Sequence, residues 1–246
     1  MKRIHSLLRS CQLRQLFSLT HPYYLSRSSL HKYISLHAAS LNSPLLDVGC
    51  GSMPYRDLFT QIIDYHGLEI SQRHSDFQNY ATFWCDGKVI PLSNSTYQSV
   101  LCSQVLEHSA NSSLTLLEIN RILVVGGHLL LTMPFIWPEH EKPFDFQRFT
   151  SFGIKSHLNE AGFNIIEINI SCIGVVCLLQ LHIEFLESLI RVLSPKDFHT
   201  TLRNMLRPYY LIVNLLGRAS VFLSRMLRLI SADELYLDLV VLAVKQ

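Results

Sequence analysis

Residues 45–51 have the sequence LLDVGCG, and this stretch decides the fold. An apolar run reaches an acidic residue, Asp47, and is then interrupted by two closely spaced glycines, Gly49 and Gly51. A short apolar run that ends in glycines predicts a buried strand followed by a tight turn. Glycine also lets the backbone approach a ligand without a Cβ in the way. The pattern predicts a strand and a ligand-binding loop, with a helix starting at Pro54.

A similar glycine pattern, G-x-G-x-x-G, occurs in proteins that bind dinucleotides. Its third glycine allows the following helix to pack closely on the strand. In this chain Pro54 stands at that third position. The sequence therefore disfavours a site of the NAD type.

Acidic residues follow the glycine loop at regular intervals. Glu69 lies near the end of an expected strand, 65–70, and comes 18 residues after Gly51. An acid about 20 residues past such glycines accepts hydrogen bonds from ribose hydroxyls in Rossmann-like sheets. Asp86 follows a further expected strand, 81–85. Glu69 is therefore a candidate for binding a ribose.

Two more motifs complete the pattern. Residues 97–108 have the sequence YQSVLCSQVLEH, and residues 117–132 have the sequence LEINRILVVGGHLLLT. In this order and at this spacing, the motifs resemble those of class I S-adenosylmethionine-dependent methyltransferases, in the type 11 (UbiE/COQ5-like) group. The resemblance covers roughly residues 29–170 and the last strand. It departs from the usual pattern in having Gln98 where an acid is common, and Glu69 where Asp is commoner.

The resemblance implies a fold, a cofactor and a set of residues that bind it. The fold is α/β, a Rossmann-like doubly wound and mostly parallel seven-stranded sheet with an antiparallel last strand near 236–244. The cofactor is S-adenosyl-L-methionine, with Glu69 on the ribose and Asp86 on the adenine amino group. The cofactor-binding candidates are Asp47, Gly49, Cys50, Gly51, Glu69, Ile70, Asp86, Gly87 and Gln104.

Strands and helices alternate along the middle of the chain, as a doubly wound parallel sheet requires. A chain of 246 residues with 48% hydrophobic content can bury one substantial core, so a single domain with an insertion is expected. Besides those above, strands are expected near 99–103, 127–133 and 163–170, and a helix over 150–161. The expected segments are a basic N-terminal helical segment 1–44, a cofactor-binding core 45–170, an amphipathic helical insertion 171–234, and a final strand 235–246.

Charge is segregated along the chain although the net charge is only +2. Residues 1–44 carry six basic residues and no acid, and residues 199–230 carry five arginines and no acid. Apolar residues recur every three or four positions among these arginines, which is typical of amphipathic helices. The insertion is either a helical lid or an element that lies on an anionic membrane surface. Pro208 is expected to divide it into two helices.

No window of the insertion reaches the roughly 20 apolar residues that a transmembrane helix needs. The basic N-terminus, with Ile4, Leu7, Leu8, Cys11, Leu16 and Phe17 on one helical face, fits a mitochondrial transit peptide. It fits equally well the N-terminal helices that cover the cofactor site in the family that the chain resembles. A cytoplasmic location, with a possible membrane contact, is expected ahead of a mitochondrial one.

Cysteine and histidine spacing suggests neither disulfides nor metal binding. The six cysteines contain no C-x-x-C pair, so reduced thiols of the cytosolic type are expected. The twelve histidines show no H-E-x-x-H or related spacing, so no metal is expected.

Polar residues for catalysis are concentrated in residues 133–150, MPFIWPEHEKPFDFQRFT, which follow the fifth strand. Ligands bind beyond the carboxyl ends of strands in sheets of this type. His140 is the first candidate for a general base and His108 the second, since a hydroxyl or amine nucleophile needs a base with a pKa near neutrality. Asp145 and Arg148 are expected to pair and shape the loop.

The sequence leaves two classes of function open. One is a methyltransferase that acts on oxygen or carbon of a small-molecule, lipid-linked or glycan acceptor. The other is a methyltransferase-like binding protein without catalysis. An RNA methyltransferase is a third alternative, but no DNA partner is expected, because residues 103–106 are SQVL rather than the N/D-P-P-[YFW] of amino-base methyltransferases.

Overall fold

The computed structural model describes residues 18–226 and 235–246. Contacts divide the chain into two compact units, which are described separately here. The sheet unit comprises residues 31–170 and 238–246, and the described part of the helical unit comprises residues 18–30, 171–226 and 235–237. The boundary expected at residue 44 falls inside the sheet unit, and the expected domain boundaries stay predictions.

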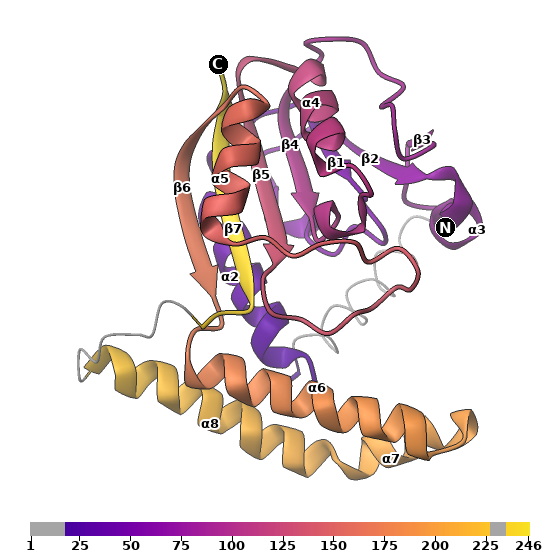
Figure 1. Cartoon of the computed structure of the whole chain (residues 1–246), viewed down its shortest axis with the longest axis vertical. Helices are drawn as coiled ribbons and strands as arrows, with labels where there is room; N and C mark the ends of the chain where they lie inside the picture. Colours follow the sequence, from indigo (N-terminus) through magenta and orange to yellow (C-terminus); the bar gives the residue numbers. More distant parts are fainter. Residues whose placement is uncertain (1–17, 227–234) are drawn as a thin grey trace. The chain divides into compact units, whose positions relative to one another are not determined.

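Seven strands form one sheet in the order β3-β2-β1-β4-β5-β7-β6 (Figure 1). Neighbouring strands from β3 to β5 pair in parallel, whereas β7 runs antiparallel to β5. This topology confirms the predicted doubly wound sheet with an antiparallel last strand. The strands are β1 (Leu45–Val48), β2 (Tyr65–Ile70), β3 (Phe83–Cys85), β4 (Tyr97–Ser103), β5 (Leu123–Pro134), β6 (Phe163–Ser171) and β7 (Asp238–Lys245).

The central strand β1 is buried along its whole length, as expected for a strand with neighbours on both sides and helices on the faces of the sheet. Asp47 lies in register with Gly67 of β2 and with Leu101 of β4. Because these strands are parallel, their carboxyl ends meet at one edge of the sheet. The loops that carry the predicted site residues all leave from this edge.

Two helices of the sheet unit, α4 (Ser112–Ile122) and α5 (Ser151–Glu160), lie against one face of the sheet (Figure 1). Each starts at a polar cap whose oxygen accepts a hydrogen bond from a backbone N–H three residues later. Asn111 caps α4 at 3.0 Å, and Thr150 caps α5 at 3.0 Å. The α5 boundaries agree with the helix predicted over 150–161.

The α-helix expected to start at Pro54 is absent, and this prediction is wrong. Only a 3₁₀ turn, η1 (Arg56–Leu58), forms between β1 and β2. The Arg56 guanidinium donates to the carbonyls of Phe59 at 3.1 Å and Ile62 at 3.4 Å. The side chains of Phe59 and Ile62 are buried, so the segment folds as a compact loop held by its own side chains. Between β2 and β3 lie the 3₁₀ turn η2 (Ser71–Arg73) and the short α3 (His74–Phe77).

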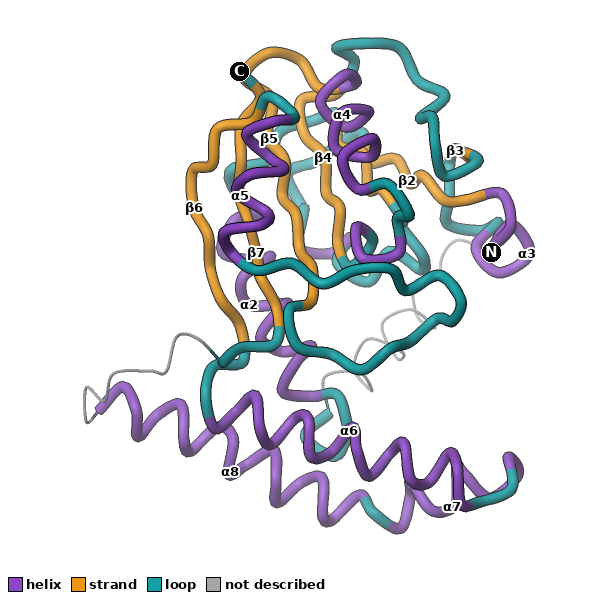
Figure 2. Tube along the Cα trace, in the orientation of Figure 1, coloured by secondary structure: helices purple, strands orange, loops and turns teal. Residues whose placement is uncertain are grey.

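The helical unit is built on α6 (Val175–Leu193), α7 (Lys196–Met205) and α8 (Arg207–Met226), and α2 (Tyr24–Ala38) runs from it into the sheet unit. Helices α6 and α8 lie side by side (Figures 1 and 2), with Ile183, Tyr210 and Val213 in their shared core.

The predicted break near Pro208 is confirmed, because the chain leaves α7 and enters α8 at Leu206. Pro208 itself lies in the first turn of α8, where the missing N–H breaks no intrahelical hydrogen bond. No helix among residues 18–226 and 235–246 has the length and apolar character needed to cross a membrane. The amphipathic face and the transit-peptide interpretation proposed for residues 1–17 lie outside the described residues.

Candidate active site

The glycine loop after β1 requires glycine for two separate reasons. Gly49 and Gly51 have φ angles of 66° and 48°, in the left-handed region that side chains disfavour. A Cβ on Gly49 would also lie 2.3 Å from the Cγ2 of Val105. The Gly49 N–H donates to the carbonyl of Leu68 at 2.8 Å, so the turn is anchored on β2.

The Cys50 side chain is buried against Gly67 of β2, and its predicted contact with the cofactor stays a prediction. Burial together with the nearby carboxylates raises the pKa of the Cys50 thiol. The neighbouring strand must carry a glycine here, because a Cβ on Gly67 would meet the Cys50 Sγ at 2.7 Å and the Met53 Cε at 2.4 Å. Sequence reasoning did not select Gly67. Its signal was a glycine in the middle of an expected strand, which marks a close backbone approach.

Asp47 is held inside the fold by a hydrogen bond from β2. The Tyr65 hydroxyl donates to the Asp47 Oδ2 at 2.6 Å, and burial raises the pKa of Tyr65. The Arg56 guanidinium lies over the Tyr65 ring, 4.5 Å from its centroid. Asp47 therefore stabilises the base of the glycine loop, and its contact with a cofactor stays a prediction.

Glu69 links the end of β2 to the glycine loop. Its Oε2 accepts a hydrogen bond from the Gly51 N–H at 3.0 Å, and its Oε1 accepts one from the Ile70 N–H at 3.0 Å. A carboxylate oxygen has two lone pairs, so each oxygen can accept one more hydrogen bond. Glu69 is thus buried, fixed in place by the loop that it orders, and still able to bind hydroxyl groups.

Asp86 and Gly87 form an exposed turn after β3. The Asp86 Oδ1 accepts hydrogen bonds from the N–H groups of Lys88 at 2.8 Å and Val89 at 3.1 Å, and these bonds lower the pKa of Asp86. Gly87 has a φ of 81°, which this turn requires. Among the described residues no donor contacts the Asp86 Oδ2, so this oxygen can accept a hydrogen bond from a ligand.

The Gln104 side chain contacts residues of β5 and β7. Its Nε2 donates to the Thr132 Oγ1 and to the Asp238 Oδ1, each at 3.3 Å. Its backbone N–H donates to the Thr132 carbonyl at 2.9 Å, with φ at 56°. Gln104 thus joins β4, β5 and β7, and its predicted contact with the cofactor stays untested.

The groups predicted to bind S-adenosylmethionine meet at one place. The glycine loop, Glu69 and Asp86 follow β1, β2 and β3, which are consecutive parallel neighbours in the sheet. The loop is a cradle that a Cβ on Gly49 would disrupt, and two carboxylates with spare lone pairs stand beside it. These residues fit a nucleoside with ribose hydroxyls and an amino group.

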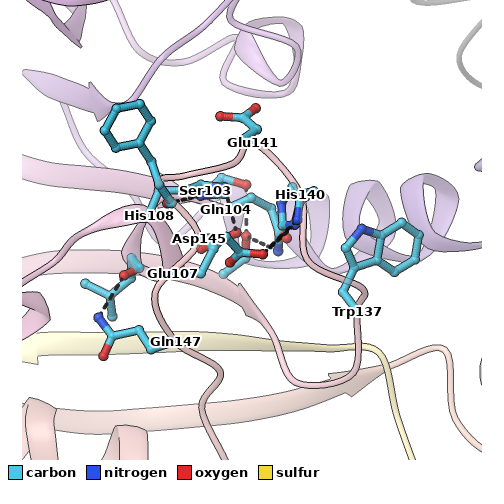
Figure 3. Close-up of polar contacts among 12 residues, drawn as sticks. Ser103, Gln104, Glu107, His108, Trp137, His140, Glu141, Asp145 and Gln147 are labelled. Atoms are coloured by element: carbon cyan, nitrogen blue, oxygen red, sulfur yellow. Dashed lines mark hydrogen bonds and ion pairs between the residues drawn. The ribbon is translucent and has the colours of Figure 1, made fainter.

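Both candidate bases lie next to each other. His108 belongs to the 3₁₀ turn η3 (Leu106–His108) after β4, and His140 belongs to the long loop 135–150 between β5 and α5 (Figure 2). Their ring centroids are 4.8 Å apart, and the ring planes are inclined by 76° (Figure 3). The structure therefore brings together two residues that sequence reasoning treated as alternatives.

Hydrogen bonds fix which nitrogen of each ring carries the hydrogen. The His108 Nδ1 lies 2.8 Å from the Phe144 carbonyl oxygen, which can only accept. The His140 Nδ1 lies 3.2 Å from the Pro138 carbonyl oxygen and 3.2 Å from the Asp145 Oδ2, which are also acceptors. Both Nδ1 atoms therefore donate, and in the neutral rings both Nε2 atoms have a lone pair.

The predicted pairing of Asp145 with Arg148 is confirmed. The Arg148 Nη1 and Nη2 donate to Asp145 Oδ1 and Oδ2 at 2.5 and 2.7 Å, a two-point contact that holds the pKa of Asp145 well below its usual range. The Asp145 Oδ2 also accepts the His140 backbone N–H at 2.9 Å. This pair shapes the loop and orients His140.

Glu107 is a residue of this cluster that sequence reasoning missed. It is fully buried, and neither carboxylate oxygen has a hydrogen-bond partner among the described residues. Its Oε1 lies 3.8 Å from the His108 Nε2, and burial raises the pKa of Glu107 to about 8. The available signal was an acid in the turn after an apolar strand and directly before a histidine.

A family model described as a methyltransferase domain matches residues 9–168. The chain belongs to this family. The family implies S-adenosyl-L-methionine as its cofactor, and the prediction of an S-adenosylmethionine-dependent methyltransferase is confirmed. A sequence comparison with curated proteins finds no match.

Solved structures with low sequence identity share the fold. They include the cyclase SpnF, with 16% identity over 88% of this chain and 79% of that chain, and a TM-score of 0.54. A putative sarcosine dimethylglycine methyltransferase from Galdieria sulphuraria has 12% identity over 88% and 85%, with a TM-score of 0.54. A putative methyltransferase bound to the Haloferax volcanii activator Trm112 has 17% identity over 91% and 93%, with a TM-score of 0.52.

Proposed function

We propose that this methyltransferase transfers a methyl group to a hydroxyl oxygen of a hydrophobic, lipid-linked acceptor. The observation that carries the proposal is the pair of imidazoles, His108 and His140, whose Nε2 lone pairs can receive the proton of a hydroxyl. Transfer to carbon is the second candidate, and the same pair could serve it by removing a proton from an activated carbon acid.

When bound, S-adenosylmethionine supplies a methyl group attached to a positively charged sulfur. An acceptor oxygen can attack the methyl carbon in line and displace the sulfur. Within the chain, the glycine loop allows the cofactor to approach the backbone closely. Glu69 would accept hydrogen bonds from the ribose hydroxyls, and Asp86 would accept one from the adenine amino group. Asp145 and Arg148 hold the loop so that the His140 ring keeps its orientation.

Placement in the type 11 (UbiE/COQ5-like) group is also part of this proposal. Its E-x-x-R motif forms a defined contact in the structure. Glu118 and Arg121 pair at 2.8 Å, and Arg121 donates to the carbonyls of Ile90 at 2.8 Å and Leu92 at 2.7 Å. The motif thus fastens the loop after β3, which carries Asp86, to α4. The motif therefore has a structural role, because it holds the loop that carries a predicted cofactor-binding residue.

The test of methyl transfer uses cofactor labelled at the methyl group and a cell extract fractionated by polarity. Label should appear in an organic-soluble fraction, and its chemical stability identifies an ether, an ester or a carbon–methyl bond. The His140→Ala variant should label at least about 100-fold more slowly with unchanged cofactor affinity, because a base is lost. Glu139→Ala, an exposed change in the same loop, is the control. Equal rates for the two variants would remove His140 from the reaction.

Cofactor binding is tested separately by calorimetry with S-adenosylhomocysteine. Glu69→Ala should weaken binding by about 1.5–3 kcal/mol, because a charged acceptor of hydrogen bonds is lost. Glu167→Ala, a carboxylate elsewhere on the sheet, should bind like the wild type. Unchanged affinity of the Glu69 variant would contradict the assignment of the ribose site.

The lipid-linked character of the acceptor is proposed from the surface of the helical unit. Apolar side chains are exposed along α6 and α8, mostly three, four or seven residues apart, so each helix presents an apolar row. On α6 the row contains Val175, Leu178, Phe185, Leu189 and Val192. On α8 it contains Ile212, Leu215, Leu216, Phe222 and Met226.

Exposed arginines accompany the α8 row. Arg207 and Arg218 are exposed, they lie three helical turns apart and therefore share a side of α8, and neither forms an ion pair with a described residue. The segment 199–230 contains no acid, but Arg203 pairs with Glu187 of α6 at 2.6 Å. The remaining combination of apolar rows and unpaired arginines favours an anionic membrane surface.

Sedimentation with vesicles tests this contact. The protein should pellet with vesicles that contain anionic lipid at low salt and less at high salt, because salt screens exposed charges. Arg218→Glu should reduce pelleting, whereas Lys155→Glu, an exposed reversal in the sheet unit, should not. Pelleting that does not depend on salt or on lipid charge would indicate a purely apolar contact. If the protein does not pellet at low salt, the helices are a lid and do not bind the membrane.

A further inference from the structure

We infer that Glu107, His108 and His140 form a binding site for a divalent transition-metal cation of the Zn²⁺ type. One ring nitrogen of each histidine and one carboxylate oxygen of Glu107 lie within 4.8 Å of one another (Figure 3). Two of these residues come from the turn after β4, and the third comes from the loop after β5. The sequence-based expectation of no metal considered linear spacing only, which cannot detect a site built from two segments.

Glu107 is a buried acid whose carboxyl has no hydrogen-bond partner in the described part of the chain. Its side chain is fully buried, and neither oxygen accepts a hydrogen bond within the described chain. A carboxylate in that situation is costly, and each such group in a folded protein requires an explanation. The nearest arginine in the loop, Arg148, has both terminal nitrogens on Asp145. A cation held at the Glu107 oxygens would supply the partner that the fold itself does not.

The two histidines are oriented as histidines that bind metals are. Histidines that bind metals donate the hydrogen of their other ring nitrogen to a carbonyl or a carboxylate, which fixes the ring and its tautomer. The His108 Nδ1 does so with the Phe144 carbonyl, and the His140 Nδ1 does so with Pro138 and Asp145. Both outer contacts leave the Nε2 lone pairs for a ligand. The His108 Nε2 lies 3.8 Å from the Glu107 Oε1.

The donor set decides the class of metal. Two imidazoles and one carboxylate suit Zn²⁺ or Fe²⁺ rather than Mg²⁺ or Ca²⁺, which prefer oxygen ligands. Bonds of about 2.0–2.2 Å require the three side chains to close by about 1 Å around the ion. With three protein ligands, a zinc site keeps a position open for water or for an oxygen of the acceptor.

The role of the cation rests on the proposed function, although the site itself stands on geometry alone. A hydroxyl coordinated by the cation releases its proton to water more readily, and its oxygen can then accept the methyl group. In the metal-bound state the histidines act as ligands and hold the acceptor oxygen in position. The inference therefore narrows the acceptor to a molecule that bears a hydroxyl.

Calorimetric titration of the full chain, without an affinity tag and after treatment with a chelator, tests the site directly. We expect about one Zn²⁺ to bind per chain, Co²⁺ to give the absorption bands of a low-coordinate site, and Mg²⁺ to give no heat. Glu107→Gln and His140→Ala should each weaken Zn²⁺ binding at least about tenfold. His157→Ala, a histidine of α5 hydrogen-bonded to Ser113, should bind Zn²⁺ like the wild type.

Absence of binding, or equal affinity for all three variants, would overturn the inference. Glu107→Gln preserves the size of the side chain, and its urea unfolding curve shows whether the variant is folded. The same samples are titrated with S-adenosylhomocysteine and assayed for methyl transfer. If the chelated protein binds the cofactor and transfers methyl at the full rate without regaining metal, the role of the cation in the reaction is overturned while the proposed function stands.

Discussion

Two glutamates, Glu107 in the sheet unit and Glu187 in the helical unit, are both fully buried but have opposite surroundings. Glu187 accepts hydrogen bonds from Arg203 at 3.0 and 2.6 Å and from the Tyr210 hydroxyl at 2.6 Å. Glu107 accepts no side-chain hydrogen bond within the described chain. A buried carboxylate that is fully satisfied holds helices together, whereas an unsatisfied one beside two oriented histidines indicates a place for a ligand.

The two units also differ in where their apolar side chains lie. In the sheet unit, β1 is buried along its length and β7 is buried except at its end. In the helical unit, α6 and α8 bury one face against each other and expose apolar residues on another. A pair of helices that is apolar on two sides can cover only one of them with its partner. The exposed side therefore points to a function in binding rather than to stability.

The largest effect is expected at the satisfied glutamate. Arg203→Met leaves Glu187 buried without its charged partner, so urea unfolding should show a loss of about 3 kcal/mol. Arg218→Met, an exposed change on α8, should cost about 0.5 kcal/mol or less. Similar losses for both variants would mean that the Glu187 pair does not hold α6 to α7.

The matching change in the sheet unit should have almost no effect on stability. Glu107→Gln removes a carboxyl that has no hydrogen-bond partner, so the free energy of unfolding of the metal-free protein should stay within about 0.5 kcal/mol of the wild type. A loss as large as that of Arg203→Met would show that Glu107 has a structural partner, and the contrast between the two glutamates would disappear.

The glycine loop offers a second, smaller test of strain built for ligand binding. Gly49→Ala should cost about 2–3 kcal/mol in total, from its positive φ and from the contact of the new Cβ with Val105. Gly126→Ala is the control, because Gly126 has a φ of 77° but no atom within 4 Å of its Cβ position. Only Gly49→Ala should also weaken binding of S-adenosylhomocysteine. Equal effects on binding would remove the loop from the cofactor site.

A further small effect is expected in the pH dependence of the helical unit. Burial, and the charges of Arg27 and Arg203, lower the pKa of His21 from 6.5 to about 4. Below pH 6.5 the unfolded chain therefore binds a proton at His21 that the folded chain does not bind. The contribution of His21 to the free energy of unfolding is fully present above pH 6.5 and falls as the pH drops toward 4. Solvent screening of this half-buried group reduces the loss to about 1 kcal/mol.

Unfolding by urea at pH 7 and at pH 4.5 measures this loss. In the His21→Asn variant the difference between the two pH values should be smaller than in the wild type by that amount. An identical pH dependence in both proteins would show that His21 is protonated equally in the folded and unfolded chains.

Local patterns in the sequence located strands along the chain, and the resemblance to a family supplied the topology of the sheet. Apolar runs located β1, β2 and β4, because a buried strand is largely apolar, and glycine or an acid marked the ends of β1 and β2. The pairing of Asp145 with Arg148 was also predictable, since the two residues are three positions apart and chemically complementary. These features depend on neighbours in the chain, so the sequence alone contains them.

Tertiary structure decided everything that depends on residues far apart in the chain. Whether Glu107 is buried, whether His108 meets His140, and whether Arg203 finds Glu187 all follow from how separate segments pack. The missing helix after Pro54 has the same origin in part, because the burial of Phe59 and Ile62 depends on the packing of the whole sheet unit. A sequence shows which groups are present, but only packing removes water from the Glu107 carboxylate and places it beside two histidines.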